Sequence, residues 1–265
     1  MLKFAPSQIE WKSNFAKIIR STSKSDPDSF ARRLAHALYK RLPSISIPID
    51  IRAIASILDV KEISYSPLSD KADSSLLPFG NGYAIQINSN IRSETRQRFS
   101  FCHEFAHILI EKYFSKIASK HCSFSINTMA DYREHEQLCD KIAAEILIPY
   151  DFITVRAQEK YPSIESISAL CNEFKASFPS MLRRLMELKI WKFGLINWYI
   201  KEDIYNITEN WHTCGSLPEK LIHNIRNSPQ LSCTYWTGKS STERWSDCLI
   251  EHKSLTKNNI ISCVW

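Results

Sequence analysis

The chain has 265 residues, 44% of them hydrophobic, so it can bury one substantial core and a second, smaller domain. Its longest apolar stretch, residues 143–150, is far shorter than the roughly 18 to 20 residues that cross a bilayer, so we expect neither a membrane span nor a membrane partner. The formal net charge of +6 is a mild basic excess that permits a nucleic-acid partner without requiring one.

The N-terminal half alternates helical and extended patterns. Apolar spacing predicts helices over residues 7–20 and 29–42. A third, short helix should follow Asp50, whose carboxylate can accept the amide hydrogens of the first turn. Residues 62–66 and 82–88 then favour strands. These elements predict a small sheet ahead of the longest helices.

Two long helices and a pair of shorter ones follow. The long helices are expected over residues 93–114 and 131–148, and Pro149 should end the second. The shorter helices are expected over residues 163–174 and 177–188, joined by a polar corner.

Beyond residue 190 the pattern changes to short alternating segments, and six of the seven tryptophans lie there. We expect these segments to form a small α+β domain with a tryptophan-rich core. The predicted organisation has four parts: an N-terminal helical extension (1–28), a core that holds the two long helices (29–160), a helical subdomain that is similar to a helix-turn-helix (161–189) and a C-terminal accessory domain (190–265).

Eight cysteines are scattered along the chain without a C-x-x-C pair, which favours free, mostly buried thiols in a reducing compartment. The first ten residues lack the continuous apolar core and cleavage site of a secretion signal. We therefore expect a cytoplasmic protein.

The first long predicted helix carries a metal-binding pattern, His103-Glu104-Phe105-Ala106-His107. His103 and His107 are four residues apart, so both imidazoles project from one face and can bind one Zn²⁺. Glu104 is rotated by about 100° around the helix, which places it beside the metal, where a general base stands. Zinc lowers the pKa of a bound water toward 7, and the carboxylate can take its proton. The pattern predicts a zinc peptidase; the alternative is an amphipathic helix with two surface histidines.

The second long predicted helix offers further ligands. Glu136 is the favoured third metal ligand, and Glu134 and His135 are the alternatives. Asp140 lies one turn beyond Glu136, next to an apolar series, and a charge there needs a partner such as the free N–H of a ligand histidine. Acidic residues at a helix start can instead be solvated near the positive end of the dipole, which explains Glu134 better than Asp140.

Four side chains are candidates for stabilising the negative charge that develops on the substrate carbonyl oxygen. Tyr83, His121, Tyr132 and His135 can each donate a hydrogen bond, and the sequence does not choose among them.

Both long helices resemble the ImmA/IrrE family of metallopeptidases. Residues 96–107 read RQRFSFCHEFAH, similar to the family's arginine-rich lead, phenylalanine and H-E-x-x-H. Residues 136–149 are similar to its pattern E-x-x-A-[ND]-x-F-A-x-x-L-L-x-P, with Cys139 in place of alanine and Ile142 in place of phenylalanine. The register of this pattern selects Glu136.

The resemblance covers about residues 29–189, and residues 82–88 look like the family's edge strand. It implies an α+β fold: a zincin-like helical peptidase core with a small sheet, then helix-turn-helix-like helices and a small C-terminal α+β domain. It also implies a cytoplasmic protease that uses Zn²⁺ to cut a helix-turn-helix repressor or another product of a neighbouring gene, in transcriptional regulation such as a stress response.

Two other interpretations stay open. The helix pair around residues 169–188, with Arg183 and Arg184 on its second helix, resembles a DNA-binding helix-turn-helix. Few side chains of that second helix could reach bases, so direct DNA binding is the weaker interpretation. Alternatively, the chain is a zinc-bound regulatory, antitoxin or defence module that binds a partner or DNA without cleaving. Glu104 argues against this, because a purely structural metal site has no use for a base.

Overall fold

The computed structural model describes most of the chain, with gaps. The described residues are 11–69, 72–118, 128–191, 194–201, 204–212, 233–236, 248–256 and 259–264. The chain divides into two compact units: Ile9–Tyr150 with Glu173–Ser177, and Met1–Gln8 with Asp151–Asn172 and Phe178–Trp265. Each unit mixes helices and strands, so the predicted α+β class is confirmed. The four-part organisation stays a prediction.

The first two helices of the unit that holds the metal-binding pattern begin at side-chain caps. Helix α1 spans Asn14–Ser23, not residues 7–20 as predicted, because Ser13 Oγ accepts the N–H of Ala16 and sets the start. Helix α2 spans Pro27–Tyr39 and is capped by Asp26. Residues 7–10 lie outside the described part of the chain.

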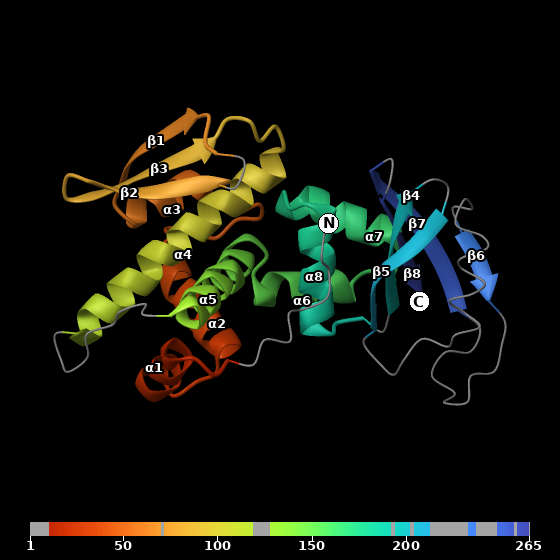
Figure 1. The fold of residues 1–265 in the computed structure, drawn as a ribbon, viewed down its shortest axis with the longest axis horizontal. Coiled ribbons are helices and arrows are strands. Elements are labelled where there is room, and N and C mark those ends of the chain that lie inside the picture. The colour runs from red at the N-terminus through yellow and green to blue at the C-terminus, as the bar shows by residue number, and fades with distance from the viewer. Residues whose placement is uncertain are drawn as a thin grey trace. The chain divides into compact units, whose positions relative to one another are not determined.

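Helix α3 and a three-stranded sheet follow (Figure 1). Their bounds are α3 Ile51–Ile57, β1 Val60–Ser66, β2 Ser74–Phe79 and β3 Gly82–Asn88. The strand order is β1-β3-β2, with β3 parallel to β1 and antiparallel to β2. The interpretation of residues 82–88 as an edge strand is therefore wrong: β3 is central, because the unpredicted strand β2 covers its free side. Gly80, with φ 58°, supplies the left-handed residue of the turn between β2 and β3.

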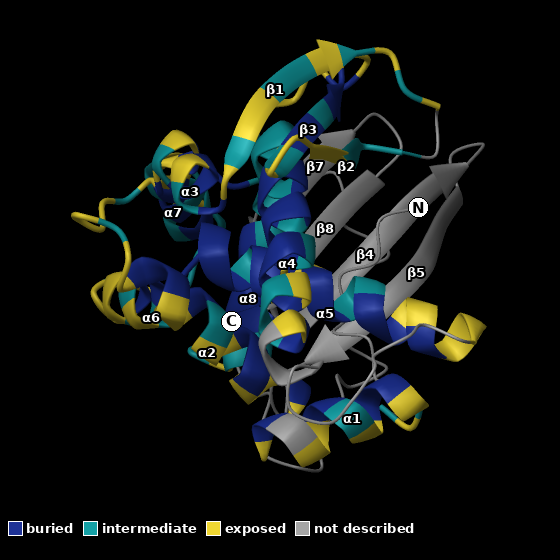
Figure 2. Cartoon of the chain, turned by 90° about the vertical axis from the view of Figure 1, so that its left-hand side faces the viewer, coloured by how far each residue is buried: buried dark blue, intermediate teal, exposed yellow. Residues whose placement is uncertain are grey.

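Two long helices form the centre of this unit. Helix α4 spans Glu94–Ala118 and contacts β2, β3 and α3, and helix α5 spans Met129–Leu147 and contacts α4, α2 and α1. Figure 2 shows large buried surfaces on both helices. Thr128 and Asp131 form a capping box at the start of α5. Apolar packing on several sides fixes α4 and α5 against each other, so their side chains can hold a precise site.

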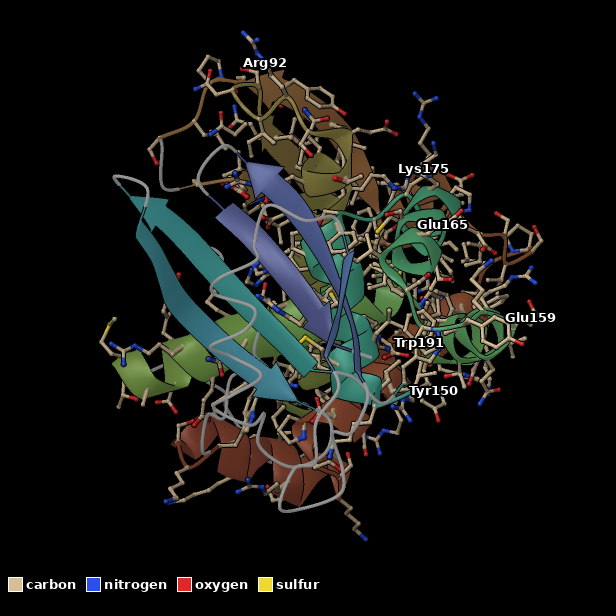
Figure 3. All side chains as sticks on the ribbon, turned by 90° about the vertical axis from the view of Figure 1, so that its right-hand side faces the viewer. Arg92, Tyr150, Glu159, Glu165, Lys175 and Trp191 are labelled. Atoms are coloured by element: carbon tan, nitrogen blue, oxygen red, sulfur yellow. The ribbon has the colours of Figure 1, made fainter. Side chains whose placement is uncertain are left out.

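The other unit contains three helices and a larger sheet. The helices are α6 Tyr150–Gln158, which was not predicted, α7 Ile164–Phe174 and α8 Phe178–Leu188. The strands are β4 Gly194–Lys201, β5 Ile204–His212, β6 Cys233–Trp236, β7 Cys248–Thr256 and β8 Asn259–Val264, in the antiparallel order β5-β4-β8-β7-β6. Trp191, labelled in Figure 3, donates its indole N–H to the carbonyl of Ala157 on α6 at 3.0 Å. None of the described helices has the length and apolar character that crossing a bilayer requires.

Candidate metal centre

Helices α4 and α5 bring three potential metal ligands together. His103 Nε2 lies 3.2 Å from Glu136 Oε2, and His107 Nε2 lies 3.9 Å from Glu136 Oε1. The two imidazole rings are 4.8 Å apart between centroids. One carboxylate from α5 therefore faces two imidazole nitrogens from α4, with one of its oxygens toward each.

The outer nitrogen of each imidazole has its own partner. His103 Nδ1 lies 2.9 Å from Asp140 Oδ1, as the sequence argument expected for a ligand histidine. His107 Nδ1 lies 3.4 Å from Cys139 Sγ. Burial raises the pKa of the Cys139 thiol well above its usual value, so this thiol stays protonated. Both contacts leave the Nε2 atoms directed at Glu136.

The electrostatics of the two histidines differ. Burial lowers the pKa of His103, but the carboxylates of Asp140 and Glu136 outweigh burial and raise the pKa to about 10. Burial and the charge of His103 lower the pKa of His107 to about 4, so His107 is a neutral imidazole with a free lone pair. Burial also raises the pKa of Glu136, but hydrogen bonds from His103 and His135 outweigh it and hold that pKa well below its usual range.

Glu104 is buried beside this cluster, at 5% exposure. Burial raises the pKa of its carboxyl group, while a hydrogen bond from Ser74 and the charge of His103 lower it. Ser74 is the first residue of β2, and its hydroxyl donates to Glu104 Oε1 at 2.5 Å. The sequence analysis missed Ser74, and no local pattern marks it, because its role depends on the pairing of β2 with β3.

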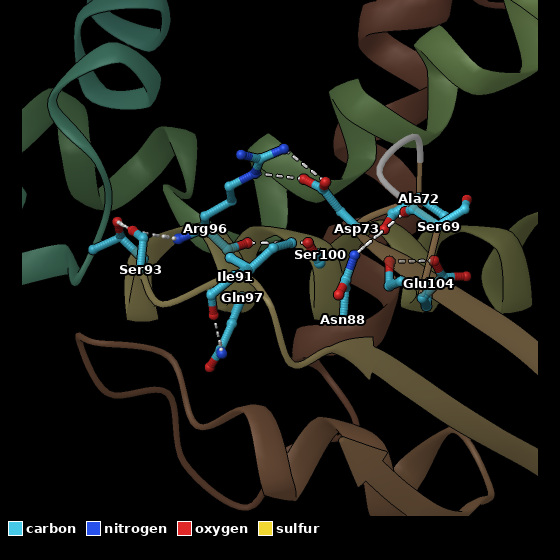
Figure 4. Close-up of polar contacts among 12 residues, drawn as sticks. Ser69, Ala72, Asp73, Asn88, Ile91, Ser93, Arg96, Gln97, Ser100 and Glu104 are labelled. Atoms are coloured by element: carbon cyan, nitrogen blue, oxygen red, sulfur yellow. Dashed lines mark hydrogen bonds and ion pairs between the residues drawn. The ribbon is translucent and has the colours of Figure 1, made fainter. Parts of the chain in front are cut away.

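A polar network fixes the start of β2 above α4 (Figure 4). Asp73 accepts two hydrogen bonds from the Arg96 guanidinium, at 2.6 and 2.7 Å, and its carbonyl accepts the N–H of Asn88 at 3.0 Å. Asn88 Nδ2 in turn donates to the carbonyl of Ala72 at 2.8 Å. Arg96 and Glu104 are two turns apart on one face of α4, so the same face orients β2 and carries the acidic side chain.

The other predicted site residues have separate surroundings. Glu134 accepts hydrogen bonds from the backbone at the start of α1, away from the two imidazoles. His135 is buried, with its ring centroid 5.1 Å from that of His107 and its Nδ1 3.5 Å from Glu136 Oε1. Tyr132 is half exposed, and Tyr83 interacts with Glu111 and Lys112. His121 lies outside the described residues. Of the four described residues, the structure thus brings only His135 to the cluster.

The donor set fits a divalent metal ion. Two overlapping groups have ligand atoms within 4.8 Å of one another: His103, His107 and Cys139, and His107, His135 and Glu136. The first group is the poorer choice, because Cys139 Sγ faces Nδ1 of His107, whereas the Glu136 carboxylate faces Nε2 of both histidines. Two imidazole nitrogens and a carboxylate are a common ligand set of catalytic zinc, with one position left for water or substrate. The second group offers the same donor types, with His135 Nδ1 3.5 Å from Glu136 Oε1. His103, His107 and Glu136 are a third combination, which draws on both groups and is favoured because both Nε2 atoms of α4 face the two oxygens of one carboxylate.

Comparison with known proteins agrees with this geometry. Residues 58–186 match the peptidase M78 family, described as the IrrE N-terminal-like domain. These residues, just under half of the chain, are similar to the IrrE N-terminal-like domain. This confirms the resemblance to the ImmA/IrrE family and supports a metallopeptidase-type regulatory protein. No curated protein matches the chain.

A solved structure shares the fold of this IrrE-like chain. A Mycobacterium tuberculosis transcriptional regulator superposes with a TM-score of 0.55 and 14% sequence identity, covering 94% of this chain and 79% of that one. Identity this low shows the common fold.

Helix α8 of the IrrE-like chain is a poor candidate for reading bases. Arg184 is buried at 6% exposure, and its guanidinium lies 3.8 Å from the Glu187 carboxylate. Met181, Leu182 and Leu185 on the same helix are fully buried. The Arg184 side chain is therefore not exposed for contact with the bases of DNA.

Proposed function

We propose that the chain is a zinc-dependent endopeptidase that cuts one regulatory protein, with a helix-turn-helix repressor encoded by a neighbouring gene as the leading candidate substrate. The observation that supports this most is the meeting of His103 and His107 with Glu136 next to a buried Glu104. A base beside three metal ligands serves hydrolysis, whereas a structural zinc site needs a fourth ligand and no base.

His103, His107 and Glu136 would hold the metal. Asp140 accepts the Nδ1 proton of His103, so a metal bound at this ring would replace the proton on Nε2 and leave the Nδ1 proton in place. When bound, zinc supplies an acidified water and polarises the substrate carbonyl.

Glu104 acts as the general base. Its carboxylate takes a proton from the attacking water and returns it to the amine that leaves when the peptide bond breaks. Ser74 holds Oε1 of this carboxylate, so the second oxygen is oriented toward the reaction. Of the three described candidate donors for the carbonyl oxygen, His135 is the best placed, because its ring lies next to His107.

The regulatory part of the proposal rests on the family. IrrE-like domains belong to metallopeptidase-type regulatory proteins, and the solved structure of similar fold is a transcriptional regulator. A protease of this type acts on a protein substrate, and a repressor is a substrate whose loss changes transcription.

The test is a cleavage assay with purified neighbouring gene products. The zinc-loaded chain should cut one of them at a single site, and a chelator should abolish the cut. Glu104→Gln should lose cleavage while keeping its zinc, because the amide cannot accept the proton. Cleavage that survives in Glu104→Gln contradicts the role of Glu104. A zinc-loaded wild type that binds a neighbour without cutting it favours the sequestering module.

A further inference from the structure

The net charge of the chain is concentrated in its N-terminal helices. Residues 11–41 hold eight lysines and arginines against two aspartates, and the rest of the chain holds 26 basic and 26 acidic side chains. The whole formal charge of +6 therefore belongs to the segment that forms α1 and α2. A charge concentrated in this way gives a strong local positive potential, which the same charge spread over the chain would not.

Both aspartates of this segment have other partners. Asp26 caps α2 by accepting the N–H groups of Asp28 and Ser29. Asp28 forms an ion pair with Lys141 of α5. Both negative charges are already counted in the +6 of this segment, and neither carboxylate forms an ion pair with a described lysine or arginine of α1 or α2.

The basic side chains are exposed along one stripe of each helix. We define the N-terminal basic surface as Lys17, Arg20 and Lys24 of α1 and its C-cap, together with Arg33, His36 and Lys40 of α2 and its C-cap. Within each helix these residues are spaced by three or four positions, which places them on one face. Among the described residues, none of the five lysines and arginines of this surface is in an ion pair. Their charges are therefore available to a partner.

A hydrogen bond joins the basic stripes of α1 and α2. Arg33 Nη1 donates to the carbonyl of Ser23, the last residue of α1, at 2.9 Å. A hollow of about 560 Å³ lies at this junction; it has an apolar part from Leu34, Ala37 and Tyr113, and the remaining lining residues are Ser23, Arg33, His36 and Lys40. Such a hollow lets an extended anion lie against several basic groups together.

Helix α1 is fixed to α5 at its start. The Glu134 carboxylate accepts the N–H groups of Lys12 and Ser13 at 2.9 and 3.1 Å, and Asp131 accepts the N–H of Phe15 at 2.8 Å. Phe15 is 1% exposed. The basic stripe of α1 therefore sits on a fixed scaffold, which lowers the entropic cost of binding.

The composition of this surface selects the kind of partner. The large exposed hydrophobic side chains of the described residues all lie outside residues 11–41. Protein interfaces usually have an apolar centre, whereas nucleic-acid interfaces are polar and strongly positive. The distance along α2 from Arg33 to Lys40 is about 10 Å. Over the same distance, one strand of B-DNA presents about three phosphates. We propose that the N-terminal basic surface binds the phosphate backbone of duplex DNA without reading its sequence.

This inference is independent of the proposed peptidase activity and is tested by binding alone. The probe is a fluorescent 20-base-pair duplex of mixed sequence, titrated with the full chain at 50 and 200 mM salt. With about four phosphate contacts, the wild-type Kd should rise on the order of 100-fold between the two salt concentrations. The double variant Arg33→Glu, Lys40→Glu should bind at least about tenfold more weakly at 50 mM and should lose about two units of the salt slope.

The matched control is Arg52→Glu, Arg92→Glu, which makes the same change in net charge at exposed positions away from this surface; Figure 3 shows Arg92 pointing into solvent. It should keep most of the affinity and the wild-type salt slope, and thermal unfolding should show that both double variants fold. Equal weakening by both pairs would overturn the proposal. A wild-type chain that does not bind the duplex would also overturn the proposal. If that chain bound a polyglutamate peptide instead, the partner would be an acidic protein.

Discussion

Ser74 and Glu104 are joined by a hydrogen bond of 2.5 Å between the first residue of an edge strand and the middle of the motif helix. The donor is a hydroxyl and the acceptor a carboxylate at 5% exposure. Asp73, the residue before Ser74, is itself held by Arg96 of the same helix. The orientation of the proposed base therefore depends on how the sheet is attached to α4.

Replacing Ser74 should lower the rate of cleavage without removing the metal. A hydrogen bond to a charged group contributes about 1.5 to 3 kcal/mol, so Ser74→Ala should lower kcat by about ten- to a hundredfold if the bond orients Glu104. KM and zinc content should stay near the wild-type values, and Ser74→Thr, which keeps the hydroxyl, should recover most of the rate. Steady-state kinetics and metal analysis measure these quantities.

The matched control for this variant is Ser75→Ala. Ser75 pairs with Gln86 and Ser74 with Ile87, so the two serines face opposite sides of the sheet. Ser75→Ala should leave kcat within about twofold of wild type. Equal losses of kcat in the two alanine variants would mean that Ser74 acts only through the stability of β2.

Removing Asp140 should weaken zinc binding. Its carboxylate holds Nδ1 of His103, and partners of ligand histidines are typically worth ten- to a hundredfold in metal affinity. Asp140→Ala should therefore raise the zinc Kd by about that factor in competition with a chromophoric chelator. Asp151→Ala, at an exposed carboxylate of α6, should leave the Kd unchanged. An unchanged Kd in Asp140→Ala would argue that His103 is not a ligand.

Glu134 should matter for stability, although it was an alternative metal ligand. Its buried carboxylate accepts two backbone N–H groups at the start of α1, and each group left without a partner costs about 1 to 3 kcal/mol. Glu134→Ala should lower the free energy of unfolding by about 2 to 4 kcal/mol in urea, while the exposed Glu165→Ala should change it by less than about 0.5 kcal/mol. If Glu134→Ala folded stably but no longer bound zinc, Glu134 would be a metal ligand.

Asp131 should make stability depend on pH in acid. The N–H of Phe15 and the hydroxyl of Thr128 hold the pKa of Asp131 below its ordinary value of 3.8 in the folded chain. A lowered folded-state pKa gives stability that is present above the unfolded-state pKa and is lost as the pH falls through the folded-state pKa. Asp131→Asn should thus be less stable than wild type at pH 7, and the gap in urea midpoint should narrow below about pH 4. A gap that is constant from pH 7 to pH 3 would contradict this.

Local signals in the sequence were sufficient for much of the helical core. Asp50 caps α3 as predicted, because its carboxylate accepts the N–H groups of Arg52 and Ala53. The alternation over residues 82–88 predicted the bounds of β3. Spacing of four residues also predicted that His103 and His107 share a face, a relationship that any regular helix enforces.

Features that depend on distant residues were missed. Strand β2 ends in Pro78 and Phe79 and lacks clear alternation, so its extended form is set by pairing with β3. Without β2, the sequence could neither place β3 at the centre of the sheet nor bring Ser74 to Glu104. The contact of Cys139 with His107 was missed for the same reason, because it depends on how two helices pack.

The most direct test of the zinc site is an X-ray absorption spectrum of the zinc-loaded chain together with its metal content. We expect about one zinc per chain, with scattering from nitrogen and oxygen atoms only, at about 2.0 to 2.2 Å, and loss of high-affinity zinc in Glu136→Ala. A Zn–S distance near 2.3 Å would place Cys139 in the metal site, and a chain that binds no zinc would contradict the central claim.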